Sequence, residues 1–145
     1  MDAAVFVVRV LLGGLLIAAG ALKVGHSAEL ASNIAGFRLL PPDVIGPLAV
    51  ALPYVELLLG GYLIAGLFTK VVAVIAVVQF LAYAGAIGSA VLRHIPVSCG
   101  CFGPNDSAAA DWPHVAFDLV LALSAVFVAY AAPGALAVDR KLRRA

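Results

Sequence analysis

Residues 70–92 read KVVAVIAVVQFLAYAGAIGSAVL. Apart from Lys70 at its start, this stretch carries no charged residue, and it is apolar all round rather than in the alternating pattern of a strand. An α-helix rises 1.5 Å per residue, so about 20 such residues cross the ~30 Å hydrocarbon core of a bilayer. Because unpaired backbone groups are costly in lipid, a run of this kind predicts a membrane-spanning helix.

Three further apolar runs of similar length occupy residues 3–22, 47–67 and 113–132. The chain is 64% hydrophobic and 12% charged, far from the roughly one-half and one-quarter of soluble domains, and a chain of 145 residues cannot bury so much apolar surface in water. We therefore predict an all-α, polytopic membrane four-helix bundle, one domain over residues 1–145, with the lipid bilayer as its solvent. The net charge of only +1 does not suggest the basic surface that nucleic-acid binding requires.

The basic residues predict the orientation. Residues 133–145 form a tail rich in Lys and Arg, which stays cytoplasmic under the positive-inside rule. Four crossings then place both termini in the cytoplasm and the connections 23–46 and 93–112 outside. The basic residues on the inner side are Arg9, Lys70, Arg140, Lys141, Arg143 and Arg144, against Lys23, Arg38 and Arg93 on the outer side.

The first outer connection has a helical pattern of its own. Leu30, Ile34 and Phe37 recur at helical spacing, which predicts a short amphipathic helix from Ser27 to Arg38, ended by the prolines that follow. Small residues within the long runs predict faces where helices pack closely, although they also fit a general bias toward small residues. They are Gly13, Gly14, Ala18, Gly20, Gly60, Gly61, Ala82, Gly85 and Gly88.

The second outer connection holds both cysteines, in the segment HIPVSCGCFGP at residues 94–104. A Cys-x-Cys disulfide closes a very small ring, and departure from preferred geometry makes such a bond easier to reduce. It also closes almost no loop, so it has little structural value. Cys99 and Cys101 therefore predict an exchange disulfide. Three alternatives stay open: inert thiols, a purely structural disulfide, or a zinc or cuprous copper site completed by His94 and His114.

Ionisable groups inside the membrane are candidate sites by default. Glu56 lies near the middle of its predicted helix, and Gln79 lies at a matching depth on the next one, so the two are expected to meet near the midplane. His114 and Asp118 form an i, i+4 pair facing the outer mouth. Lys23 and Arg93 end the first and third runs on that side. These residues predict either a hydrogen-bonded polar cluster that holds the helices together or a functional pocket.

Several of these features together resemble the MauE family of methylamine-utilisation membrane proteins, within the broader DoxX-like four-helix group. The resemblance rests above all on Cys99-Gly-Cys101-Phe-Gly103. It also includes Lys23, the FRLLP segment at residues 37–41, Pro53, Glu56, Gly60 and the WPHV segment at residues 112–115. It implies a bacterial inner-membrane protein that works with a thioredoxin-like partner in forming or reducing disulfides outside the cytoplasm. A departure is Phe117, where the family often has an arginine.

The functional hypothesis is a thiol-disulfide oxidoreductase, hence an enzyme, in which Cys99 and Cys101 exchange their disulfide with an extracytoplasmic thioredoxin-like or substrate protein. By analogy of architecture alone, the carrier could be a quinone near Glu56, Gln79 and Tyr83. One alternative is a protein that binds a metal or small ligand through the two cysteines with His94 and His114. The other is an assembly subunit or scaffold for a membrane-associated enzyme.

Overall fold

The computed structural model describes residues 1–100, 103 and 108–142. Its helices are α1 (Asp2–Lys23), α2 (Ser27–Gly36), α3 (Pro42–Ala65), α4 (Thr69–Leu92), α5 (Trp112–Ala131) and α6 (Val138–Leu142). Within this part of the chain, four helices, α1, α3, α4 and α5, are long and apolar enough to cross a membrane. The predicted all-α membrane bundle with a short helix in its first connection is confirmed.

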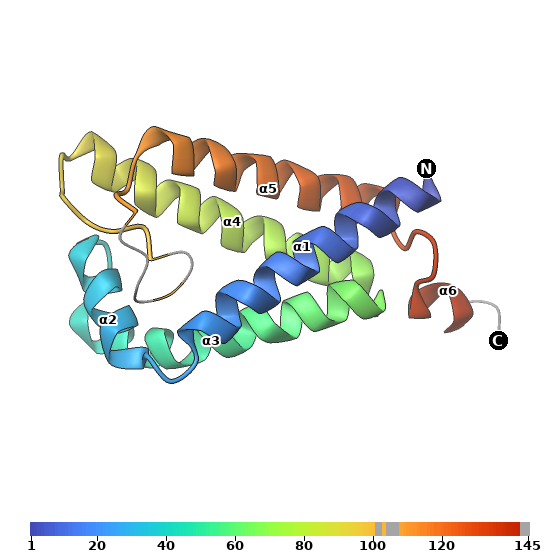
Figure 1. Ribbon diagram of the computed structural model, residues 1–145, viewed down its shortest axis with the longest axis horizontal. Coiled ribbons are helices and arrows are strands. Elements are labelled where there is room, and N and C mark those ends of the chain that lie inside the picture. The colour runs from blue at the N-terminus through green and yellow to red at the C-terminus, as the bar shows by residue number, and fades with distance from the viewer. Residues whose placement is uncertain (101–102, 104–107, 143–145) are drawn as a thin grey trace.

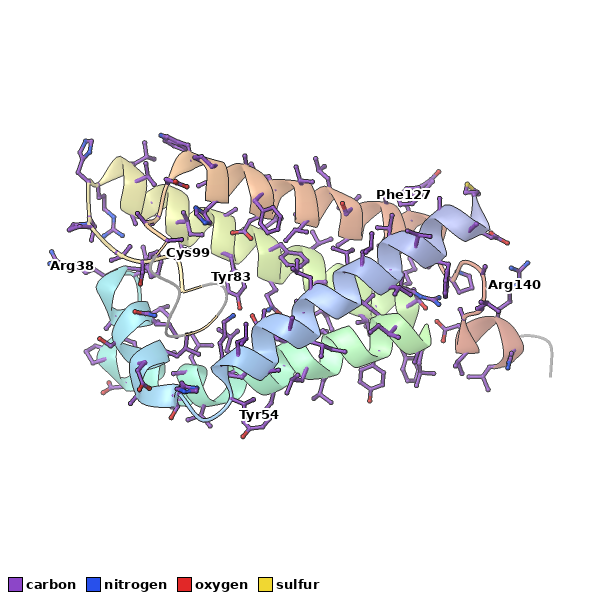
Figure 2. The ribbon with its side chains drawn as sticks, viewed as in Figure 1. Arg38, Tyr54, Tyr83, Cys99, Phe127 and Arg140 are labelled. Atoms are coloured by element: carbon purple, nitrogen blue, oxygen red, sulfur yellow. The ribbon has the colours of Figure 1, made fainter. Side chains whose placement is uncertain are left out.

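Each of the four long helices presents large apolar side chains on the outside of the bundle. Leu11, Leu58, Val78 and Leu123, one from each helix, are all more than half exposed. In Figure 2, Tyr54 and Phe127 point away from the bundle on opposite sides. Monomeric soluble proteins rarely expose so much contiguous apolar surface, whereas in a bilayer it faces lipid. The chain is therefore a multi-pass membrane protein.

The long helices pack mainly as two pairs, α1 with α3 and α4 with α5, and contact between α3 and α4 is sparser. The first pair crosses where glycines meet. A Cβ atom on Gly13 would lie 2.7 Å from the carbonyl oxygen of Gly60, and one on Gly20 would lie 2.7 Å from that of Pro53. The predicted close packing is confirmed for these glycines. It is wrong for Gly14, Gly61 and Gly85, which face open space.

Several helix boundaries differ by one or more residues from the predicted ones, and two of these differences have a clear physical reason. Helix α3 begins at Pro42 rather than at residue 47, because a proline fits the first helical turn, where no backbone N–H donor is needed. Pro47 and Pro53 then lie inside the helix. Helix α2 ends at Gly36 rather than at Arg38, whose φ of +53° is incompatible with a continuing helix.

The two ends of the bundle differ in what they carry. The N-terminus and α6 lie at one end of the bundle (Figure 1), whereas α2 and Cys99 lie at the other (Figure 2). This arrangement is the one that four crossings require. Cys99 therefore lies at the opposite end of the bundle from α6.

At the tail end, residues after α5 fold back onto the bundle. Arg9 is fully buried in α1, and its guanidinium donates to the carbonyl oxygens of Pro133 at 2.8 Å and Ala135 at 3.4 Å. Asp139 accepts hydrogen bonds of 2.8 Å from the backbone N–H groups of both Phe68 and Thr69, which begin α4. The sequence analysis placed Arg9 on the inner side without a partner and did not consider Asp139. In the structure they bind the tail to α1 and α4.

We expect Asp139→Ala to lower the free energy of unfolding by about 1–2 kcal/mol, because it leaves two backbone donors at the start of α4 without their cap. The matched control is Asp2→Ala, which removes an exposed 2.7 Å ion pair with Arg140 and should change stability by no more than about 0.5 kcal/mol. Denaturant titration in detergent micelles measures both variants. Equal losses would contradict the proposed capping role.

Candidate functional site

The centre of the bundle holds a buried ion pair. Lys23 is 3% exposed and Glu56 is fully buried, and the Lys23 ammonium lies 2.7 Å from Oε1 and 3.0 Å from Oε2 of that carboxylate. A charge in the membrane interior is stable only with a close partner, and here both oxygens of the carboxylate accept from one cation. Lys23 was expected at the outer end of the first helix. In the structure its side chain reaches inward to Glu56.

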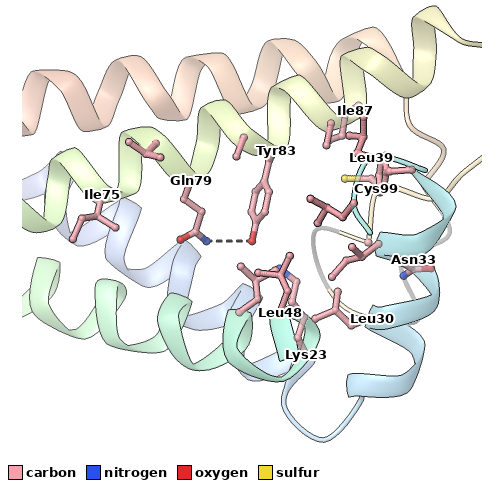
Figure 3. Close-up of a pocket in the computed structure, with 18 residues that line it drawn as sticks. Lys23, Leu30, Asn33, Leu39, Leu48, Ile75, Gln79, Tyr83, Ile87 and Cys99 are labelled. Atoms are coloured by element: carbon pink, nitrogen blue, oxygen red, sulfur yellow. Dashed lines mark hydrogen bonds between the residues drawn. The ribbon is translucent and has the colours of Figure 1, made fainter. Parts of the chain in front are cut away.

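Two side chains from α4 complete this polar cluster. The Tyr83 hydroxyl donates to Glu56 Oε1 at 2.5 Å. The Gln79 amide nitrogen lies 3.3 Å from the same oxygen and 3.2 Å from the Tyr83 hydroxyl, the contact dashed in Figure 3. The sequence expectation that Glu56 and Gln79 meet agrees with this geometry. The cluster of Lys23, Glu56, Gln79 and Tyr83 joins α1, α3 and α4 at one point.

A cavity of about 430 Å³ lies beside the polar cluster, between α2, α3 and α4. Its walls are mostly aliphatic, and its lining includes Lys23, Gln79 and Tyr83 of the cluster together with Cys99. Ile75 and Cys99 lie at opposite ends of this lining (Figure 3). Sequence reasoning did not find the cavity, because it depends on how far apart α3 and α4 lie.

The segment with Cys99 is fixed by backbone hydrogen bonds. The Cys99 N–H donates to the carbonyl of Ala108 at 2.8 Å, and the Ala110 N–H donates to that of Val97 at 2.9 Å. Cys99 itself is 8% exposed, and the described residues contain no free cysteine. Cys101 lies outside the described residues, so the pairing of the two cysteines stays a prediction.

Helix α2 packs against this segment. The Ser98 hydroxyl donates to the Asn33 side chain at 3.4 Å, and Gly100 adopts a φ of +63° with its Cα turned toward Asn33, so that an added Cβ would lie 3.0 Å from the amide nitrogen. Arg93 donates to the carbonyl and hydroxyl oxygens of Ser89, at 3.1 Å each, and to the carbonyl oxygen of Phe37. Arg93 therefore fastens the end of α4 to the residue that follows α2.

The structure does not bring the remaining predicted site residues, His94, His114 and Asp118, together in one site. His94 is exposed at the end of α4. His114 does not pair with Asp118: its Nδ1 lies 2.6 Å from Asp111, a partner that the sequence analysis missed. That hydrogen bond lowers the pKa of Asp111. Asp118 is 4% exposed, borders a small void beside Glu56 and Tyr83, and has no hydrogen-bond partner for Oδ2 within the described part of the chain.

The metal alternative has no cluster to support it in residues 1–100, 103 and 108–142. No group of three or more His, Cys, Asp or Glu side chains there could hold a metal ion. The proposed ligand Cys101 lies outside these residues.

Four membrane-spanning helices, a buried Lys–Glu pair and a cysteine-bearing segment over an apolar cavity define a polytopic membrane protein with an internal polar site. The family described as "Methylamine utilisation protein MauE" matches residues 1–131. The curated "Methylamine utilization protein MauE" of Paracoccus denitrificans is 31% identical over 129 residues, which are 88% of this chain and 69% of that protein. The chain belongs to the MauE family, which confirms the resemblance noted from the sequence. No solved structure matches the chain.

Proposed function

We propose that this protein is a membrane thiol-disulfide oxidoreductase whose Cys99–Cys101 disulfide exchanges with an extracytoplasmic protein. One observation carries the proposal: Cys99 lies at the end of the bundle away from α6 (Figure 2) and lines the same cavity as the buried polar cluster. A cysteine needed only for structure has no reason to share a cavity with ionisable groups. Such groups gather at sites where chemistry occurs.

The exchange proceeds through a mixed disulfide. A thiolate of the partner attacks one sulfur of the Cys99–Cys101 bond, and the second partner thiol then displaces this chain. The partner gains a disulfide, and this chain gains two thiols, so two electrons and two protons pass from partner to chain. The reverse sequence reduces the partner. The short Cys-x-Cys spacing favours this chemistry, because it leaves the disulfide strained.

The family and the charge pattern support a cellular setting for this exchange. We place the protein in a bacterial inner membrane with both termini cytoplasmic, so that the cysteines face the compartment where disulfides persist. Because the curated relative is named for methylamine utilisation, we propose that the exchange partner is a thioredoxin-like or substrate protein required for that process.

The experiment uses the oxidised protein in lipid nanodiscs and a reduced protein with a thioredoxin fold and a Cys-x-x-Cys motif. Gel shifts with a maleimide reagent count free thiols on each chain over time. We expect up to one disulfide to pass to the partner per membrane chain, and none with the double variant Cys99→Ser/Cys101→Ser. The control is Ser32→Ala, which changes an exposed residue of α2 and should leave disulfide transfer unchanged.

A second arm captures the intermediate. A partner that keeps only its first cysteine should remain attached to this chain as a mixed disulfide that reductant releases. Transfer that persists in a correctly folded double cysteine variant, or a partner that is never captured, would refute the proposed function.

A further inference from the structure

We propose that the cavity between α2, α3 and α4 binds an isoprenoid quinone, which accepts the electron pair from the reduced cysteines. This inference rests on the proposed function, because it names the electron acceptor of the same site. Three properties of the cavity suit a quinone: its size and position, its hydrogen-bond donors, and the presence of Cys99 in its wall.

The cavity has the size and position needed for a ligand that arrives through the membrane. Its volume of about 430 Å³ lies in the ~300–1,000 Å³ range of small-molecule sites. It lies between α3 and α4, the neighbouring pair with sparse contact, and its lining includes the lipid-exposed residues Ile75 and Val78. A ligand with a long apolar tail can therefore keep that tail in lipid or along these aliphatic walls.

The polar end of the cavity has hydrogen-bond donors to spare. An ammonium group has three N–H donors, and Lys23 uses two of them on Glu56. The Asn33 side chain also lines the cavity, and within the described residues its amide NH₂ has no acceptor. The carbonyl oxygens of a quinone ring only accept hydrogen bonds, so they match these donors. A hydrocarbon chain of a lipid leaves them unused.

Because Cys99 lines the same cavity, the electron donor lies next to the proposed quinone site. When the reduced pair meets the quinone, the two thiols form one S–S bond, and two electrons and two protons pass to the quinone oxygens to give a quinol. No further reactant is needed. The Lys23 cation is positioned to stabilise negative charge that develops on a quinone oxygen during the transfer. Extracytoplasmic dithiol oxidation in bacteria passes its electrons to quinones, so this acceptor suits the compartment.

The binding test uses full-length protein in nanodiscs of synthetic lipid and a benzoquinone with a decyl tail as the probe. We expect saturable binding at one site per chain. Asn33→Leu removes a donor and should weaken binding about threefold to tenfold. Ala86→Trp fills the cavity and should abolish binding. Ala116→Trp, an exposed position on α5 outside the cavity, should bind the probe as the unchanged protein does.

The cysteine double variant separates this inference from the proposed function. Binding does not depend on sulfur, so Cys99→Ser/Cys101→Ser should still bind the probe but form no quinol. Binding without quinol formation by the reduced, unchanged protein would refute electron transfer and leave the quinone site standing. No saturable binding, or equal binding by Ala86→Trp and Ala116→Trp, would refute the quinone site even if protein exchange persisted. Extraction that recovers only phospholipid from the cavity of the native protein, with no displacement by the probe, would also overturn it.

Discussion

Replacing Lys23 with methionine is expected to lower the free energy of unfolding by about 3–5 kcal/mol, the largest single effect in this chain. Methionine retains the length and most of the volume of the side chain, so the loss comes from the charge. Among the described residues, the fully buried Glu56 would keep hydrogen bonds only from Tyr83 and Gln79. A buried carboxylate without its cation must either bear the desolvation penalty or take up a proton.

A double variant separates the ion pair from general damage to the core. Lys23→Met/Glu56→Leu removes both charges together and should regain most of the stability lost in the single variant, since apolar replacement of a whole buried pair is often neutral. Lys70→Met, at an exposed position at the start of α4, is the control and should change stability by less than about 0.5 kcal/mol. Denaturant titration in mixed micelles measures all three variants. A single variant as stable as the Lys70 control would contradict the buried ion pair.

The second large effect is expected at the crossing of α1 and α3. Gly13→Leu should destabilise the protein by about 1–3 kcal/mol or more, because even its Cβ would lie 2.7 Å from the carbonyl oxygen of Gly60 and the two backbones would have to separate. In lipid, close packing of this kind supplies much of the helix association, so no hydrophobic force compensates.

The next residue along the helix supplies a matched control. Gly14→Leu makes the same change where an added Cβ meets nothing within 4 Å, and it should be neutral or slightly stabilising, because leucine favours a helix more than glycine does. The pair Gly60→Leu and Gly61→Leu should repeat this contrast from the other side of the crossing. Equal losses at Gly13 and Gly14 would show that the crossing does not depend on close backbone contact.

The sequence was sufficient for the four long helices because hydropathy alone decides which segments lipid can solvate. Counting helical rise was also enough to bring Glu56 and Gln79 to a common depth. The rotation of each helix about its axis is a different matter. A helix that is apolar all round does not indicate which face turns inward, so the pattern could not separate Gly13 from Gly14, and the inward reach of Lys23 was missed for the same reason.

Specific side-chain contacts account for the other differences, and they include both distant and local pairs. The hydrogen bonds from Arg9 to Pro133 and Ala135 join residues at opposite ends of the chain, and no local sequence pattern predicts them. The pairing of His114 with Asp111 instead of Asp118 reflects a local competition, because Asp111 stands at the N-cap of α5 and its carboxylate also accepts from the His114 N–H at 3.0 Å. A capping aspartate directly before Trp112-Pro113 was the signal that could have identified it.

The central claim is that two electrons from a partner dithiol pass through the cysteines of this chain to a quinone in the cavity. The most direct measurement follows both ends of this path at once, with nanodisc-embedded protein in catalytic amount, excess reduced thioredoxin-fold partner and the decyl benzoquinone. Quinol is read by ultraviolet absorbance and partner thiols by alkylation. We expect one quinol for each partner disulfide formed, over many turnovers. Partner oxidation at the same rate with and without quinone, or quinol formation undiminished in Cys99→Ser/Cys101→Ser, would contradict the claim.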